Sequence, residues 1–113
     1  MIATGIPMVL VYVNDVAESV KWYEATLELP VFFQDAGFAS LGVGDQRLGL
    51  HSGANTDAKT GSTPVFKVDD YLAAKVVLES RGCDFYFENE TQNAVFGSFK
   101  DPDGNPLQIM QDR

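Results

Sequence analysis

Cysteine and histidine are nearly absent from this sequence. The single cysteine, Cys83, excludes an internal disulfide and any metal cluster held by several cysteines. Cys83 follows Gly82 among apolar residues, which favours a buried, unreactive thiol over a nucleophile. His51 is the only histidine. It either solvates the polar segment at a strand end or serves as a general base facing a cavity.

Basic residues are also scarce, and long apolar runs are missing. Eight Lys and Arg stand against 16 Asp and Glu, a formal net charge of −8 at pH 7, which disfavours the phosphate backbone of a nucleic acid as partner. No apolar run approaches the roughly 18 to 20 residues of a membrane span. Residues 1–11 have no basic segment before their apolar part. We therefore expect a cytoplasmic protein without nucleic-acid or membrane partners.

What the chain does contain is enough apolar material for one core. Its 113 residues are 45% hydrophobic and 21% charged, as in an ordinary single globular domain. The excess of acidic residues is typical of a soluble protein. The negative net charge also leads to a more specific hypothesis, that the ligand is a cation.

An Asp-Pro-Asp-Gly turn at residues 101–104 introduces the last apolar segment. Its proline fixes φ near about −65° and its glycine accepts a positive φ, so the turn is tight. In the strand expected at 106–111, alternation places Leu107 and Ile109 on one face and Gln108 on the other. Gln108 therefore points away from the packed side.

The chain repeats one series of elements, because Val68 in the second half lies 55 residues after Val13 in the first. The expected elements are strands at 8–13, 31–34, 38–43 and 47–51 with a helix at 16–27, then strands at 64–68, 84–88, 94–100 and 106–111 with a helix at 71–81. Residues 53–62 are small or polar and form the linker. The fold class is therefore α+β: one domain of two βαβββ modules, at about 6–52 and 63–111, whose mixed sheets curl around a cleft.

Both expected helices begin at a side chain that can cap them. Asn14 or Asp15 serves the first helix and Asp69 or Asp70 the second, because such side chains accept the free N–H groups of a first turn. Gly82 suits the left-handed residue that ends the second helix.

This arrangement resembles the vicinal oxygen chelate superfamily, which includes glyoxalases, extradiol dioxygenases and bleomycin-resistance proteins. The resemblance rests on the two βαβββ modules and on the turn that leads into the strand of Gln108. One departure is Leu27-Glu28-Leu29, where relatives usually carry Leu-Gly after the first helix. The resemblance implies a small-molecule ligand and a homodimer.

The sheet faces turned away from the helices should line the cleft. With Gln108 as marker, alternation and the repeat assign to these faces Met8, Leu10 and Tyr12, Arg47, Gly49 and His51, and Thr63, Val65 and Lys67. Tyr12 and Arg47 would orient a ligand there, although Arg47 could equally pair with a carboxylate such as Asp45 across a dimer contact.

Metal-dependent relatives usually place a His or Gln, a Glu, a His and a Glu in this cleft. The matching positions here are Met8, Gly49 (or His51 with a slip of two residues), Thr63 and Gln108. A thioether, a hydroxyl and a neutral amide suit a hard divalent ion poorly. We therefore predict no metal ion and no other cofactor. The alternative is a divalent ion held by Gln108, His51 and waters.

Aromatic side chains on the strands predict a cleft wall. Phe85 and Phe87 are expected to share one face, with Tyr86 on the other. At least one aromatic set then faces away from the helix, where it could stack on flat or cationic groups.

These observations favour a small-molecule-binding protein that resembles the bleomycin-resistance branch and captures an apolar or cationic ligand in an aromatic cleft. The alternative is a metal-dependent lyase or dioxygenase of the glyoxalase type, so whether the chain is an enzyme stays open. A metal-independent enzyme and a structural subunit are further alternatives. The predicted ligand-binding residues are Met8, Tyr12, Arg47, His51, Thr63, Lys67, Phe85, Phe87 and Gln108.

Overall fold

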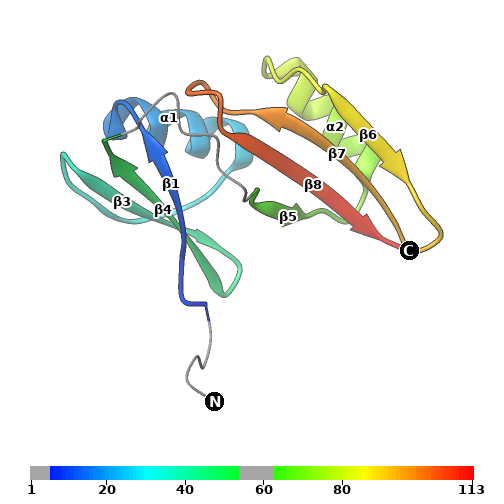
Figure 1. Ribbon diagram of the computed structural model, residues 1–113, viewed down its shortest axis with the longest axis horizontal. Helices are drawn as coiled ribbons and strands as arrows, with labels where there is room; N and C mark the ends of the chain where they lie inside the picture. The colour runs from blue at the N-terminus through cyan, green and yellow to red at the C-terminus, as the bar shows by residue number, and fades with distance from the viewer. Residues whose placement is uncertain (1–5, 54–62) are drawn as a thin grey trace. The chain divides into compact units, whose positions relative to one another are not determined.

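The computed structural model describes residues 6–53 and 63–113. The chain divides into two compact units, Met1–Ala58 and Lys59–Arg113, and each contains one helix and one four-stranded sheet (Figure 1). The linker predicted at 53–62 lies outside the described residues, apart from Gly53.

The first unit packs helix α1 (Val16–Leu27) against a sheet with the strand order β1-β4-β3-β2. The strands are β1 (Val9–Val13), β2 (Val31–Gln34), β3 (Phe38–Val43) and β4 (Gln46–Ser52). β1 runs parallel to β4, and the other pairs are antiparallel. The apolar stripe of α1, which includes Val16 and Tyr23, is buried together with Leu41 and Leu50 of the sheet.

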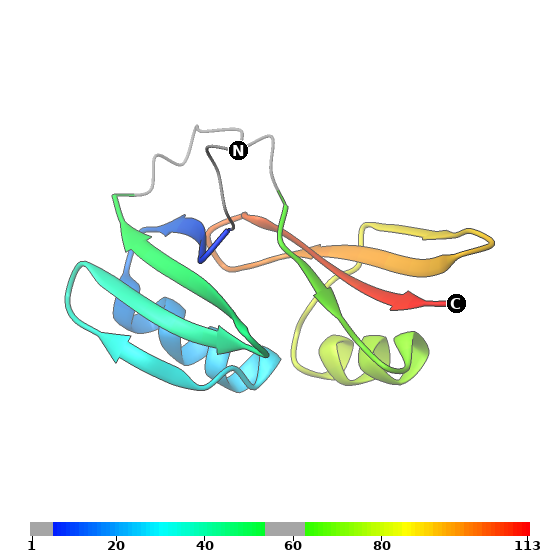
Figure 2. The same cartoon turned by 90° about the horizontal axis from the view of Figure 1, so that it is seen from below.

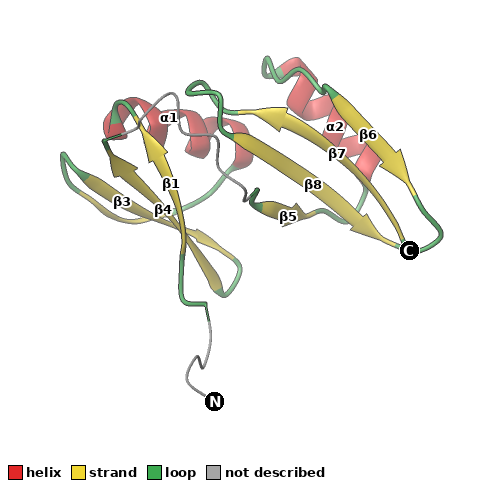
Figure 3. Ribbon diagram, viewed as in Figure 1, coloured by secondary structure: helices red, strands yellow, loops and turns green. Residues whose placement is uncertain are grey.

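The second unit repeats this arrangement with helix α2 (Tyr71–Ser80) and the order β5-β8-β7-β6. Its strands are β5 (Val65–Lys67), β6 (Phe87–Glu90), β7 (Ala94–Lys100) and β8 (Pro106–Asp112), and β5 is parallel to β8. Tyr71 and Leu78 of α2 are buried with Phe99, Leu107 and Ile109. In each unit the helix lies against one face of its own sheet (Figures 2 and 3). The predicted α+β class with two βαβββ modules is confirmed.

Local signals read from the sequence account for most of the element boundaries. The Asp15 carboxylate accepts the N–H of Glu18 at 3.1 Å, and Asp70 accepts that of Ala73 at the same distance. The buried Asp101 carboxylate accepts the N–H groups of Asp103 and Asn105 at 2.9 and 2.8 Å, which fixes the turn before β8.

The sixth strand is the element that sequence patterning misplaced. It was expected at 84–88, but β6 covers Phe87–Glu90, and its hairpin turn closes between Thr91 and Ala94. Phe85 precedes the strand, and its ring lies 5.1 Å from that of Phe99, measured between centroids. Packing of Phe85 against the core therefore replaces strand pairing at this position.

The helices that the structure describes are short. Within residues 6–53 and 63–113, none combines the length and the apolarity needed to cross a bilayer.

Candidate functional site

The face of the first sheet that points away from α1 carries the side chains that alternation assigned to it. Leu48 and Leu50 of β4 are buried on the helix side, so Arg47 and His51 lie on the opposite face. We call this surface the aromatic face. Its side chains are Met8, Leu10 and Tyr12 from β1 and the segment before it, Phe32 and Phe33 from β2, Phe38 from β3, and Arg47 and His51 from β4.

Gly49 lets the side chains of this face approach the strand backbone. A Cβ atom built on Gly49 would lie 2.6 Å from the sulfur of Met8, 2.7 Å from Cδ2 of Leu10 and 3.1 Å from Cε1 of Phe38. Those distances are shorter than van der Waals contacts. The three side chains therefore converge on the glycine and form an apolar surface that covers β4 at this position.

A bulge in β2 places two consecutive phenylalanines on the same face. Val31 pairs with Leu41 and Phe33 with Ser40, and the register shifts between these pairs. The Phe32 ring fills the space above Gly42, and the Phe33 ring lies 6.2 Å from that of Phe38. Regular alternation would have turned one of the two rings toward α1.

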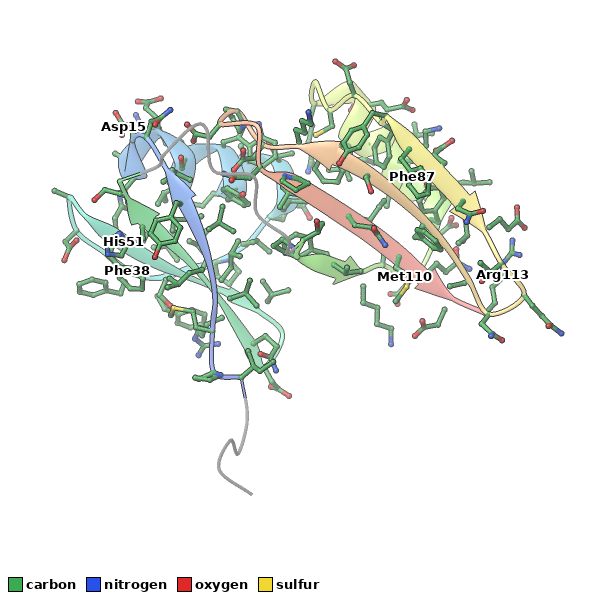
Figure 4. The ribbon with its side chains drawn as sticks, in the orientation of Figure 1. Asp15, Phe38, His51, Phe87, Met110 and Arg113 are labelled. Atoms are coloured by element: carbon green, nitrogen blue, oxygen red, sulfur yellow. The ribbon has the colours of Figure 1, made fainter. Side chains whose placement is uncertain are left out.

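The aromatic rings follow one another across the sheet. The ring centroids of Phe38 and His51, on paired strands, are 6.2 Å apart, and those of His51 and Tyr12 are 5.6 Å apart. Figure 4 shows Phe38 and His51 side by side. Phe32, Phe33 and Tyr12 remain 60%, 52% and 49% exposed. The result is a solvent-facing stripe of rings from β2 to β1.

Two polar side chains complete the aromatic face. The Arg47 guanidinium lies over the Phe32 ring, 4.1 Å from its centroid, and donates to the backbone oxygen of Gln46 at 3.1 Å. Among residues 6–53 and 63–113 no carboxylate of the same chain pairs with Arg47. The alternative that Arg47 pairs with a carboxylate such as Asp45 across a dimer contact stays a prediction. Nδ1 of His51 lies 2.6 Å from the backbone oxygen of Ser52. It must donate there, because a carbonyl oxygen only accepts.

The second sheet has a comparable face with fewer rings. Phe87 and Phe96 lie 6.1 Å apart between centroids, and the Ser98 hydroxyl donates to Oε1 of Gln108 at 3.4 Å. Phe87 and Met110 come from separate strands of this sheet (Figure 4). Lys67 on β5 belongs to the same face by alternation.

Two predicted site residues lie elsewhere. Thr63 is exposed in the segment before β5. Phe85 does not share a face with Phe87, because a Cβ atom on Gly97 would meet both Phe85 and Tyr71 on the side of α2. The prediction that Phe85 and Phe87 share one face is therefore wrong, and the cause is the later start of β6.

The side chains at the metal positions of the family do not fit a divalent ion. The first unit offers the thioether of Met8 and the imidazole of His51 there, and the second offers the Thr63 hydroxyl and the Gln108 amide. In the described part of the chain no three His, Cys, Asp or Glu side chains gather as a possible metal-binding group. A hard divalent ion prefers several carboxylates or imidazoles.

A hollow of about 650 Å³ lies on the helix side of the second sheet. The Tyr71 hydroxyl donates to Glu88 at 2.7 Å, Lys75 pairs with Glu88 at 2.5 Å, and Arg113 pairs with Glu90. Hydrogen bonds from Lys75 and then Tyr71 hold the pKa of Glu88 below its ordinary value. These charged groups satisfy one another, so the hollow is a less suitable ligand site than the aromatic face.

Comparison with known families identifies the family of this chain. The sequence model of the Glyoxalase/Bleomycin resistance protein/Dioxygenase superfamily matches residues 5–109. The chain belongs to this superfamily, as its resemblance to the vicinal oxygen chelate proteins implied.

Several solved structures are similar over nearly the whole chain. An antibiotic binding protein from a Streptomyces species is 21% identical, with a TM-score of 0.83 and coverage of 100% of this chain and 99% of that one. Lactoylglutathione lyase from Agrobacterium tumefaciens is 17% identical, with a TM-score of 0.79 and coverage of 98% and 96%. A glyoxylase/bleomycin resistance protein/dioxygenase domain from a Frankia species is 25% identical, with a TM-score of 0.76 and coverage of 98% and 99%. Comparison with curated protein sequences gives no match.

Proposed function

We propose that this protein captures a flat, largely apolar small molecule on the aromatic face, without making or breaking a bond. The observation that carries the proposal is the row of half-exposed rings, Tyr12, Phe32 and Phe33, of which the β2 bulge places the last two on one face. A planar ligand would stack on these rings and remove their apolar surface from water.

Exposure of this kind has an energetic cost that a ligand would remove. Large apolar patches are uncommon on soluble proteins unless they serve binding. Burial of apolar surface contributes about 25 cal/mol per Å². Since Phe32 and Phe33 face solvent together through a bulge rather than by regular alternation, the local backbone geometry itself favours a binding surface.

The donor set favours binding over metal-dependent catalysis. A lyase or dioxygenase that uses a metal needs ligands that hold the ion and leave a position for substrate. Met8, Thr63 and Gln108 supply a thioether, a hydroxyl and an amide instead. The similar structure of an antibiotic binding protein is a precedent for ligand capture within this fold.

The neutral fluorescent dye N-phenylnaphthylamine tests the site. We expect its fluorescence to rise on binding, and we expect Phe33→Ala to weaken binding about tenfold, because a stacked ring and its apolar contacts are lost. Val76→Ala is the matched control, since Val76 is 65% exposed on α2 and belongs to the second unit, not to the aromatic face. Equal affinity of the wild type and Phe33→Ala would refute the proposed site.

Metal analysis separates this function from the alternative of a lyase or dioxygenase. Protein purified without a histidine tag should hold far less than one divalent ion per chain, and a chelator should leave dye binding unchanged. A tightly bound stoichiometric ion would overturn the binding proposal in favour of the enzyme.

The homodimer implied by the family resemblance and the cytoplasmic location expected from composition stay predictions. Whether the protein is a binding protein or an enzyme, its ligand would be a small molecule, because members of the superfamily bind small molecules.

A further inference from the structure

We propose that the ligand of the aromatic face is an anion: a flat aromatic molecule whose carboxylate, sulfonate or phenolate group binds Arg47. This inference rests on the proposed function, because it names the ligand class of the same surface. It favours an anion over the cationic ligand that the net charge suggested.

The basic side chains of this protein differ in whether a carboxylate lies near them. Acidic residues outnumber basic ones 16 to 8, so a basic side chain has many possible partners. Three of the cations in the described residues form ion pairs: Lys21 with Glu18 at 3.4 Å, Lys75 with Glu88 at 2.5 Å, and Arg113 with Glu90. Arg47 has no such partner among the described residues, although acidic side chains are abundant.

The geometry of Arg47 leaves it ready to bind an anion. Its guanidinium lies over the Phe32 ring at 4.1 Å from the centroid, which holds the group beside that ring. The bond to Gln46 uses one of its five N–H donors. Such a planar group matches a carboxylate or sulfonate with two parallel hydrogen bonds, and Phe32 already aligns it beside the row of rings.

The rest of the aromatic face offers no negative charge to attract a cation. Its strand positions on β1 to β4 carry apolar, aromatic, glycine, serine, arginine or histidine residues, and none carries Asp or Glu. A cationic ligand would find ring faces there, but it would also be repelled by Arg47. An anion would gain both the rings and a charge-assisted hydrogen bond.

The second unit also carries basic side chains on its helix-free face, where alternation places the carboxylate of Asp112 as well. Lys67 on β5 and Lys100 on β7 lie on the face of the second sheet turned away from α2. Neither has a carboxylate partner within residues 6–53 and 63–113, and Lys100 lies 5.4 Å from the centroid of the Tyr86 ring. Within the described residues, each helix-free face therefore presents one cation that has no carboxylate partner and lies over an aromatic ring, Arg47 in the first unit and Lys100 in the second.

Two dyes that differ by one anionic group test the inference. Anilinonaphthalene sulfonate has the ring system of N-phenylnaphthylamine plus a sulfonate. We expect wild-type protein to bind the sulfonate dye at least about tenfold more tightly than the neutral dye, because hydrogen bonds to charged groups are stronger than neutral ones. Arg47→Gln should abolish that preference, because it should weaken binding of the sulfonate dye far more than binding of the neutral dye.

The control substitution makes the same change of charge elsewhere. Lys21→Gln removes a cation that is paired with Glu18 on α1 and should leave the preference intact. Equal preference loss in both variants would show a general charge effect and overturn the role of Arg47.

The outcomes separate this inference from the proposed function. If both dyes bind wild type equally and Phe33→Ala weakens both, the anionic ligand is refuted while capture on the rings stands. If Phe33→Ala affects neither dye, the proposed function fails as well. Competition on the wild type alone covers the case in which Arg47→Gln does not fold. Naphthoate should displace the neutral dye at least about tenfold better than naphthylmethylammonium, and the reverse order would overturn the inference.

Discussion

Glu28 ends helix α1 in a conformation that normally requires glycine. Its φ of 60° and ψ of 38° are left-handed, and its N–H donates to the backbone oxygen of Glu24 at 3.0 Å. The structure thus shows what the departure from Leu-Gly in the sequence means. The chain keeps the left-handed C-cap and accepts a side chain there, at a cost of about 1 kcal/mol.

Replacing Glu28 by glycine should therefore stabilise the protein. We expect Glu28→Gly to raise the free energy of unfolding by about 0.5 to 1 kcal/mol, because the strain of the Cβ atom disappears and exceeds the added freedom of the unfolded chain. Urea titration followed by the fluorescence of Trp22, the single tryptophan, measures the change. Glu24→Gly, one turn earlier within α1, should instead destabilise. A loss of stability in Glu28→Gly would contradict this interpretation.

The buried hydroxyl of Tyr71 should make the stability of the fold depend on pH in the alkaline range. Burial, and then the hydrogen bond to Glu88, raise the pKa of Tyr71 well above its ordinary value of 10.0. Above about pH 10 an unfolded Tyr71 ionises while the folded one keeps its proton, so stability must fall as pH rises through that range. Urea titrations at about pH 8 and pH 11 should show a smaller loss in Tyr71→Phe than in wild type. The same loss in both proteins would assign the effect to other groups. Tyr12→Phe, on β1 of the first unit, is the control.

At the scale of the elements, local chemistry predicted regular segments well and irregular ones poorly. The bounds of α1, β2, β3 and β7 were predicted, because turns and apolar periodicity act over a few neighbouring residues. The orientation of Arg47 and His51 followed from the same alternation. The late start of β6 did not, because Phe85 is drawn into a core formed by residues distant in sequence.

The aromatic face shows the same limit. Alternation places Tyr12 on it, but nothing in the sequence places Phe32 and Phe33 on it together. A register shift is decided by how β2 meets β3, and two adjacent phenylalanines give no local sign of it. The charge pattern could not be read either, since pairing of Arg47 depends on which carboxylates come near in space.

The N-cap residues of α1 and α2 should stabilise both helices in the same way. Asp15 and Asp70 occupy equivalent positions and have nearly identical backbone angles, with φ of −133° and −135°. Asp15→Ala and Asp70→Ala should each lower the free energy of unfolding by about 1 kcal/mol, because a first-turn N–H loses its acceptor. The asparagine variants keep an acceptor oxygen and should retain most of the stability in urea titrations. Asparagine as damaging as alanine would show that charge, not the hydrogen bond, stabilises these helices.

For the whole molecule, exposed apolar surface supports the prediction of a homodimer. Large apolar side chains that are mostly exposed include Phe32 on the aromatic face and Leu72 and Val76 on α2, at 72% and 65% exposure for the latter two. We expect sedimentation velocity to give the mass of two chains at about 10 μM, a concentration at which an ordinary specific interface is occupied. A species of one chain throughout a dilution series would contradict the prediction.

The bulge in β2 has a consequence for how this surface can diverge. Because one extra residue puts Phe32 and Phe33 on the same side, segment length rather than amino-acid type decides which rings meet solvent. Loss of a single codon within this edge strand would restore strict alternation and rotate one ring inward, with every other side chain unchanged. Ligand recognition by proteins that descend from this one can therefore change when a single residue of β2 is deleted. A comparison that considers only substitutions would miss such a change.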